Sequence, residues 1–223
     1  AFFFYFLGLI NLMFNWGHHT YIVPAAPWVK NVAYVISMTE LLILAHLIIQ
    51  WRKMMRNGRK NYHLISYRLL SYSDGWIILN LILAITISVP AWNYYTHGTH
   101  ITVAHAMGTT IGINTMLLFA SIFYIIKNEK AEVLEKRKTW IRKGIIITNI
   151  ALVIFWASLL GSGLVKISGR LNNEAFYIIM QKCQPYFKVF AYSGTLIFIG
   201  LFILIFLALK ILTAKKEITS AGL

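Results

Sequence analysis

The sequence predicts an all-α integral membrane protein, and two observations carry this prediction. Of the 223 residues, 58% are hydrophobic and only 13% are charged, whereas a soluble domain carries about 25% charged residues. The hydrophobic residues also fall in long runs, and a bilayer core of about 30 Å needs roughly 20 residues of helix. The lone cysteine, Cys183, excludes a disulfide framework and cysteine-based metal cages.

Hydropathy and window length divide the chain into six spans that form a single membrane domain over residues 1–223. The expected spans are Phe2–Trp16, Val29–Trp51, Trp76–Ala91, Ile101–Ile126, Gly144–Val165 and Tyr186–Leu212. The four prolines are Pro24, Pro27, Pro90 and Pro185. Each is expected at a span edge or in a link, where no interior helical hydrogen bond is lost.

The first span is shorter than the others. Even with Ala1 included, its sixteen residues reach only about 24 Å as a helix, less than the hydrocarbon thickness. The chain opens with Ala1 and lacks the positively charged region with which a signal peptide begins. We therefore expect the sequence to be the carboxyl-terminal part of a longer chain.

Positive charge predicts the orientation. The basic residues of the even-numbered links are Arg52, Lys53, Arg56, Arg59, Lys60 and Arg68, then Lys127, Lys130, Lys136, Arg137, Lys138, Arg142 and Lys143, then Lys215 and Lys216. The first and third links contain no Lys or Arg, and the fifth is mildly basic. By the positive-inside rule the even-numbered links face the cytoplasm. We therefore attribute the net charge of +14 to residues that set the orientation and contact anionic lipid, and we expect no nucleic-acid partner.

Polar residues that bind metals or protons gather on three spans. His18 and His19 end the first span, and adjacent imidazoles can chelate one metal, although interface histidines also serve as plain hydrogen-bonding groups. Glu40 is the one acid well inside a span, where a carboxylate faces a cavity, a metal or a proton path, or joins two helices. His105 and Met107 project about 200° apart on one helix. Both residue types ligate heme iron, and both also occur as packing residues.

Taken together, these motifs resemble the heme–copper oxidase superfamily, and most closely the large catalytic subunit of bacterial nitric oxide reductases. The resemblance rests on the stretch Asn15–Tyr21 (NWGHHTY), on Glu40 21 residues after its second histidine, and on Asn93–Thr99 (NYYTHGT) ahead of His105. It covers essentially the whole chain. It implies the last six helices of a twelve-helix subunit that reduces two NO to N2O and water.

The resemblance also implies roles for individual residues. His18 and His19 match two ligands of a non-heme iron, and His105 matches the axial ligand of the high-spin heme b3. Glu40 is similar to a glutamate implicated in proton delivery, and His97 to a histidine near the heme propionates. The other iron ligands, and the partner histidine of the low-spin heme b, belong to the amino-terminal half of the subunit.

One position departs from the family pattern. The family usually has His-x-His where this sequence has His105-Ala106-Met107. We expect Met107 to ligate the low-spin heme b and to raise its potential, as thioether ligation does. The rival interpretation is that this heme is lost or differently ligated.

Two alternatives remain open. A cbb3-like oxygen reductase would carry copper in place of the non-heme iron, but that group has a tyrosine six residues before the double histidine, where this sequence has Leu12. A transporter or a non-catalytic heme-binding subunit belongs to a different class. Its polar groups would be Asn80, Asn114 and Asn149, which we expect instead to join helices by hydrogen bonds.

The resemblance finally implies a place in the cell and a set of partners. It implies a multi-pass protein of the bacterial cytoplasmic membrane with its active site toward the periplasm. The electron donor is a membrane-anchored cytochrome c subunit or a quinol, and the sequence does not distinguish the two.

Overall fold

The computed structural model describes residues 2–14, 17, 20–58 and 64–214. All regular structure in these residues is helical, which confirms the predicted fold class. In chain order the elements are α1 (Phe2–Phe14), α2 (Pro27–Gly58), α3 (Ile65–Ser88), α4 (Pro90–Thr96), α5 (His100–Met107), the π-helix η3 (Gly108–Thr115), α6 (Met116–Leu171) and α7 (Phe176–Leu212).

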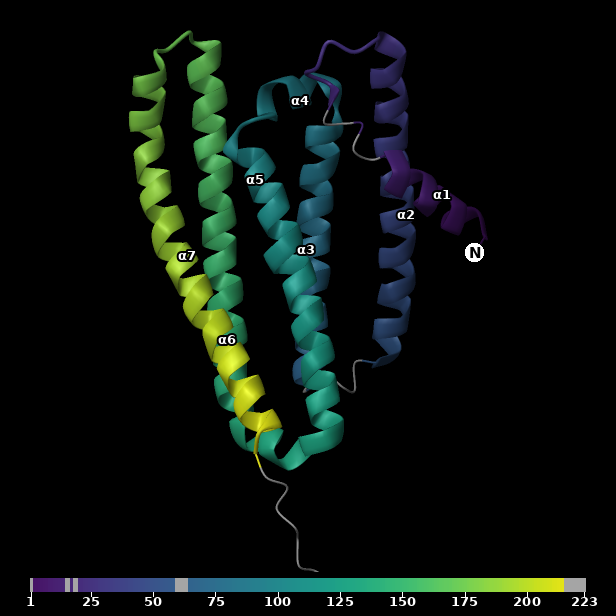
Figure 1. Ribbon diagram of the computed structural model, residues 1–223, viewed down its shortest axis with the longest axis vertical. Helices are drawn as coiled ribbons and strands as arrows, with labels where there is room; N and C mark the ends of the chain where they lie inside the picture. The colour runs from purple at the N-terminus through teal and green to yellow at the C-terminus, as the bar shows by residue number, and fades with distance from the viewer. Residues whose placement is uncertain (1, 15–16, 18–19, 59–63, 215–223) are drawn as a thin grey trace, which may run out of the picture.

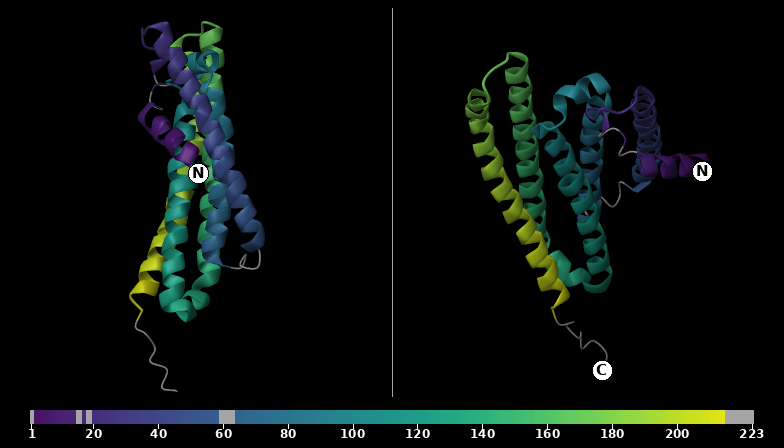
Figure 2. Two further views of the ribbon diagram at one scale, coloured as in Figure 1. Left: turned by 90° about the vertical axis from the view of Figure 1, so that its right-hand side faces the viewer. Right: turned by 45° about the horizontal axis from the view of Figure 1, so that its top comes forward.

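The long helices lie side by side along the long axis of the molecule (Figures 1 and 2). Within the described residues, four helical stretches are long and apolar enough to cross a bilayer: Pro27–Met54, Ile65–Ser88, His100–Leu171 and Phe176–Leu212. The third stretch doubles back at Lys130, whose φ of −143° and ψ of 49° break the helix, so that it supplies two crossings. The chain is therefore a multi-pass membrane protein.

The first predicted span corresponds to α1, which has 13 residues. This helix crosses α2 at an angle instead of running along it (Figure 1). Asn11 Nδ2 donates to Thr39 Oγ1 at 2.7 Å, and the Phe4 ring stacks on His46 with centroids 4.1 Å apart. These contacts join α1 to α2.

The two predicted boundaries that differ most from the structure are the starts of the third and sixth spans. The third span was expected to begin at Trp76, but α3 begins at Ile65 and includes Arg68, which the sequence assigned to a link. The helix extends because Leu69, fully buried, packs into the core cluster shared with α6 and α7. Likewise α7 begins at Phe176, ten residues before the expected Tyr186.

Pro185 was expected at a span edge and instead lies inside α7. The amino-terminal part of α7 packs closely on α6, where Ile179 lies against Gly169 and Tyr186 against Gly161. This burial continues the helix through the proline despite the hydrogen bond that a proline removes.

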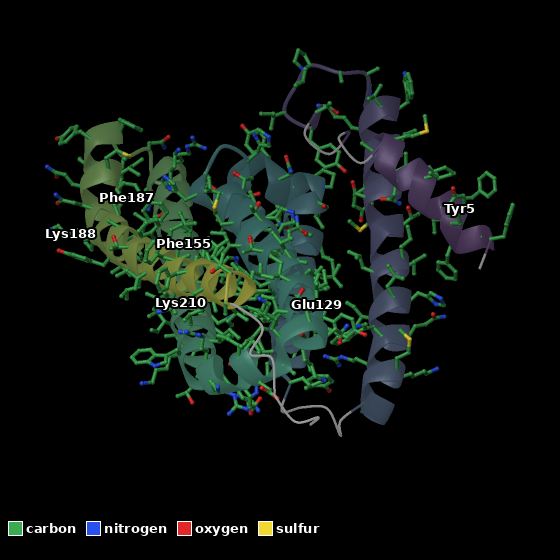
Figure 3. The ribbon with its side chains drawn as sticks, turned by 60° about the horizontal axis from the view of Figure 1, so that its bottom comes forward. Tyr5, Glu129, Phe155, Phe187, Lys188 and Lys210 are labelled. Carbon is green, nitrogen blue, oxygen red and sulfur yellow. The ribbon has the colours of Figure 1, made fainter. Side chains whose placement is uncertain are left out.

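The basic fourth link is a helical extension of the spans on either side of it. The helix of α6 continues through it on both sides of Lys130. Lys130 Nζ donates to the carbonyl of Leu212 at 2.9 Å and to that of Ala214, so a cation lies at the carboxyl end of α7. Lys210, labelled in Figure 3, lies over the Phe206 ring near the same end.

A second core cluster lies toward the other end of the bundle. It includes Trp76 of α3, Leu152 and Phe155 of α6 and Ile197 of α7. The Phe155 ring, labelled in Figure 3, packs on Phe190 with centroids 4.5 Å apart. This cluster packs against one side of α5, the helix that carries the candidate site.

Candidate functional site

The segment Asn93–Thr99 forms the turn that leads from α4 into α5. Gly98 has a φ of 69°, a left-handed conformation that glycine adopts without steric cost. Thr99 caps α5, because its hydroxyl accepts a hydrogen bond from the backbone N–H of Ile101 at 3.2 Å. Lys166 of α6 donates to the Gly98 carbonyl at 3.0 Å. The motif thus sets the direction in which α5 enters the bundle.

His97 ends α4 as its carboxyl-terminal cap. Its backbone N–H donates to the Asn93 carbonyl at 2.8 Å, and its side chain is half-buried. The contact of His97 with a heme propionate stays a prediction.

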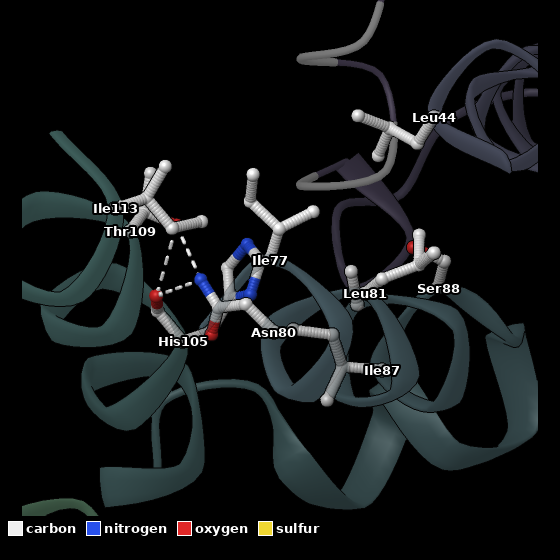
Figure 4. A pocket seen from close by; sticks show the side chains of 10 residues that line it. Leu44, Ile77, Asn80, Leu81, Ile87, Ser88, His105, Thr109 and Ile113 are labelled. Carbon is white, nitrogen blue, oxygen red and sulfur yellow. Dashed lines mark hydrogen bonds between the residues drawn. The ribbon is translucent and has the colours of Figure 1, made fainter. Parts of the chain in front are cut away.

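His105 of α5 lines a cavity of about 410 Å³ (Figure 4). Most of the other lining side chains are apolar, among them Leu44 of α2 and Ile77 and Leu81 of α3. Cofactor sites are commonly apolar cavities of about 300–1,000 Å³ with a few polar groups. One imidazole in an apolar wall is also the donor that heme iron accepts. The chemistry of this cavity therefore fits a heme held by His105.

Asn80 of α3 and Thr109 of η3 meet at the backbone carbonyl of His105 (Figure 4). Asn80 Nδ2 donates to this carbonyl at 3.0 Å and to Thr109 Oγ1 at 2.5 Å. Thr109 Oγ1 donates to the same carbonyl at 3.1 Å. The sequence indicated that Asn80 would join helices, which is confirmed, but it did not identify the partner, because no spacing rule relates residues 80 and 105.

Met107 lies on the other side of the same helix. It is half-buried and packs against the cluster that contains Trp76 and Phe155. The cavity and this cluster thus occupy opposite sides of α5, as the 200° separation of His105 and Met107 requires. Ligation of the low-spin heme by Met107 stays a prediction.

The double histidine, His18 and His19, lies outside the described residues, but its neighbours are described. Gly17 packs on α2 so closely that a Cβ at this position would lie 2.8 Å from the Cβ of Ala33. Thr20 Oγ1 donates to the Gly17 carbonyl at 2.6 Å. The residues that flank the pair are therefore anchored on the first turns of α2.

Tyr21, which precedes α2, makes a second contact with this helix at Ser37, one turn beyond Ala33. The Tyr21 side chain is buried, which raises the pKa of its phenol, while the neighbouring Ser37 side chain opposes part of this shift. The backbone of Glu40 belongs to α2, and its side chain lies outside what the structure describes. Position 40 follows Ala33 by seven residues, or about 10 Å and two turns, and so shares its face of the helix.

The non-heme iron site is not tested by these residues. Among the side chains that the structure describes, which exclude those of His18, His19 and Glu40, no three His, Cys, Asp or Glu groups could hold a metal ion together. The iron site stays a prediction.

A multi-pass helical bundle with a histidine in the wall of a cofactor-sized cavity has the features that a membrane-bound heme protein needs. Residues 1–212 match the family model of cytochrome c and quinol oxidase polypeptide I. The chain belongs to this family, the subunit I of heme–copper oxidases, whose members bind heme and act as oxidoreductases. This confirms the resemblance at the level of the superfamily. A search of the curated proteins finds no match.

Proposed function

We propose that the chain is part of the catalytic subunit of a bacterial nitric oxide reductase. The reaction joins two NO molecules through a new N–N bond, consumes two electrons and two protons, and releases N2O and water. The electrons come from a membrane-anchored cytochrome c subunit or from a quinol. The site opens toward the periplasmic side of the cytoplasmic membrane.

The observation that carries this proposal is the register of α2. The helix face that receives Gly17 and Tyr21, on either side of the double histidine, also contains position 40. An acid on that face suits an oxygen-liganded iron better than copper, because carboxylates are harder ligands than imidazoles. It also supplies a proton donor at membrane depth.

The residues of this chain have distinct tasks in the proposed reaction. His105 would hold heme b3, Met107 the low-spin heme b, and His18 and His19 the non-heme iron, with further ligands from the amino-terminal half of the subunit. When bound, the hemes and the iron supply the electrons and the electrophilic centres. Glu40 delivers protons to the oxygen that leaves as water. The apolar side chains of the cavity wall would limit the access of bulk water to the heme. Confinement of two NO molecules at the complete site would replace a chance encounter by an intramolecular step.

A cbb3-like oxygen reductase is the second candidate. In this chain Leu12 occupies the position of the tyrosine which that group carries, and leucine cannot supply a phenol. The transporter interpretation loses its support, because the family to which the chain belongs has a redox function.

The test is the ratio of iron, copper and heme in the complete purified complex, combined with NO and O2 consumption. Iron in excess of heme, no copper, and N2O formation from NO are expected. Copper together with iron equal to heme, and consumption of O2 but not NO, would assign the protein to the oxygen reductases.

A further inference from the structure

One row of side chains on α3 contacts the segment that carries and follows His105. Ser73, Trp76 and Asn80 are three and four residues apart and so share a helix face. Ser73 Oγ donates to the carbonyl of Ile113 at 3.4 Å, the Trp76 ring packs on Gly112, and Asn80 packs on Gly108. The row therefore runs along η3 and ends at its junction with α5.

The carbonyl of His105 lies at that junction. A π-helix replaces the i→i−4 hydrogen bonds of an α-helix with i→i−5 bonds, so the pattern is interrupted where η3 begins. The N–H of Gly108 is shared between the carbonyls of Ala104 and His105. The amide of Asn80 and the hydroxyl of Thr109 supply two further donors to the His105 carbonyl. Side chains thus fix the backbone of His105 where the helix pattern changes.

We propose that Asn80 is a positioning residue for the heme ligand His105. A carbonyl held by a donor from another helix fixes the peptide plane, and with it the direction in which the Cα–Cβ bond of His105 points into the cavity. Groups that hydrogen-bond the second ring nitrogen of a metal-ligating histidine orient it and affect the affinity for the metal; Asn80 would act on the same orientation through the backbone carbonyl of His105. The inference rests on the assignment of His105 as a heme ligand in the proposed function, and it does not depend on which gas is reduced.

Gly108 makes this arrangement possible. A Cβ at this position would lie 2.5 Å from Asn80 Oδ1, closer than real contacts allow. Asn80 Oδ1 has no hydrogen-bond partner within the described part of the chain, so only its Nδ2 holds the amide against η3. The glycine lets the Asn80 amide approach the backbone of the ligand-bearing helix.

The test compares Asn80→Leu with Asn149→Leu in the complete heme-loaded complex. Asn149 is a matched control, because it too is a buried asparagine that joins helices, here by accepting from Trp76 Nε1 at 3.1 Å. The measurements are the iron–histidine stretching band of the reduced protein by resonance Raman spectroscopy and the rate of heme transfer to apomyoglobin. Asn80→Leu is expected to shift or split this band and to speed heme loss about tenfold. Asn149→Leu is expected to lower only the thermal midpoint.

A second pair keeps the test informative if Asn80→Leu does not assemble. Thr109→Val removes the hydroxyl and is expected to shift the band, whereas Thr109→Ser keeps the hydroxyl and is expected to leave the band in place. The inference is overturned if Asn80→Leu or Thr109→Val keeps the wild-type band, or if Asn149→Leu shifts it equally. A shifted band in a protein that reduces O2 and not NO would refute the proposed function alone. An unchanged band in an active NO reductase would refute the positioning role alone.

Discussion

Replacing Gly112 by alanine tests the contact between α3 and η3 directly. An added Cβ would run into the indole ring of Trp76, closer than any real contact. Trp76 has little room to move: it is 3% exposed, its ring meets Trp156 edge-on at 6.1 Å, and its Nε1 donates to Asn149. The indole or η3 must therefore shift.

The change in the free energy of unfolding that Gly112→Ala causes has three contributions. Overpacking of a filled core costs about 1–3 kcal/mol. Loss of the Trp76–Asn149 hydrogen bond adds about 0.6 kcal/mol, the average for helix pairs in a bilayer. Alanine in place of a helical glycine returns about 0.5–1 kcal/mol. The net destabilisation is about 0.6–3 kcal/mol, or roughly 2–4 °C in Tm for each kcal/mol.

The assay measures the thermal midpoint of the complete complex, with tryptophan fluorescence as the signal. Gly75→Ala is the matched control, because Gly75 lies on α3 one residue from Trp76 and has nothing within 4 Å of the added Cβ. The control is expected to gain about 0.5–1 kcal/mol, so the two variants should shift in opposite directions. A Gly112→Ala variant that melts at or above the wild-type temperature would show that Trp76 does not pack on η3.

Two further predictions concern the redox site. Met107→His is expected to keep the low-spin heme and to lower its midpoint potential, because imidazole replaces a thioether ligand, and a redox titration measures this; an unmoved potential would remove Met107 from the ligand set. Glu40→Gln is expected to reduce NO turnover at least tenfold while the heme absorption spectrum stays intact, because the amide cannot release a proton. Groups that transfer protons typically contribute about 10²–10⁴-fold to the rate. Turnover at the wild-type rate would exclude Glu40 from proton delivery.

Local chemistry accounts for what could be predicted. Hydropathy identified the apolar helices, because every backbone group in a bilayer core must be satisfied within its own helix. The stretch Asn93–Thr99 could be recognised as one motif. In the structure its Gly98 adopts a left-handed turn and its Thr99 caps α5. The opposite placement of His105 and Met107 follows from helix geometry alone.

Packing between distant segments accounts for the features that could not be predicted from the sequence. The early starts of α3 and α7 are stabilised by Leu69 and Ile179 against α6, and such burial leaves no local signal. The π-helix Gly108–Thr115 likewise has no periodicity of its own by which a sequence could predict it.

The sequence by itself thus determined the membrane class from composition and the family motifs from short spacings, and the resemblance that these motifs carry indicated His105 as a candidate ligand. Only the tertiary structure decided that Asn80, 25 residues away, donates to the His105 carbonyl. It also decided that Trp76 and Asn80 meet two glycines of η3. Such contacts depend on how one helix docks on another, and docking is determined by the summed packing of the whole bundle, not by any single stretch of the chain.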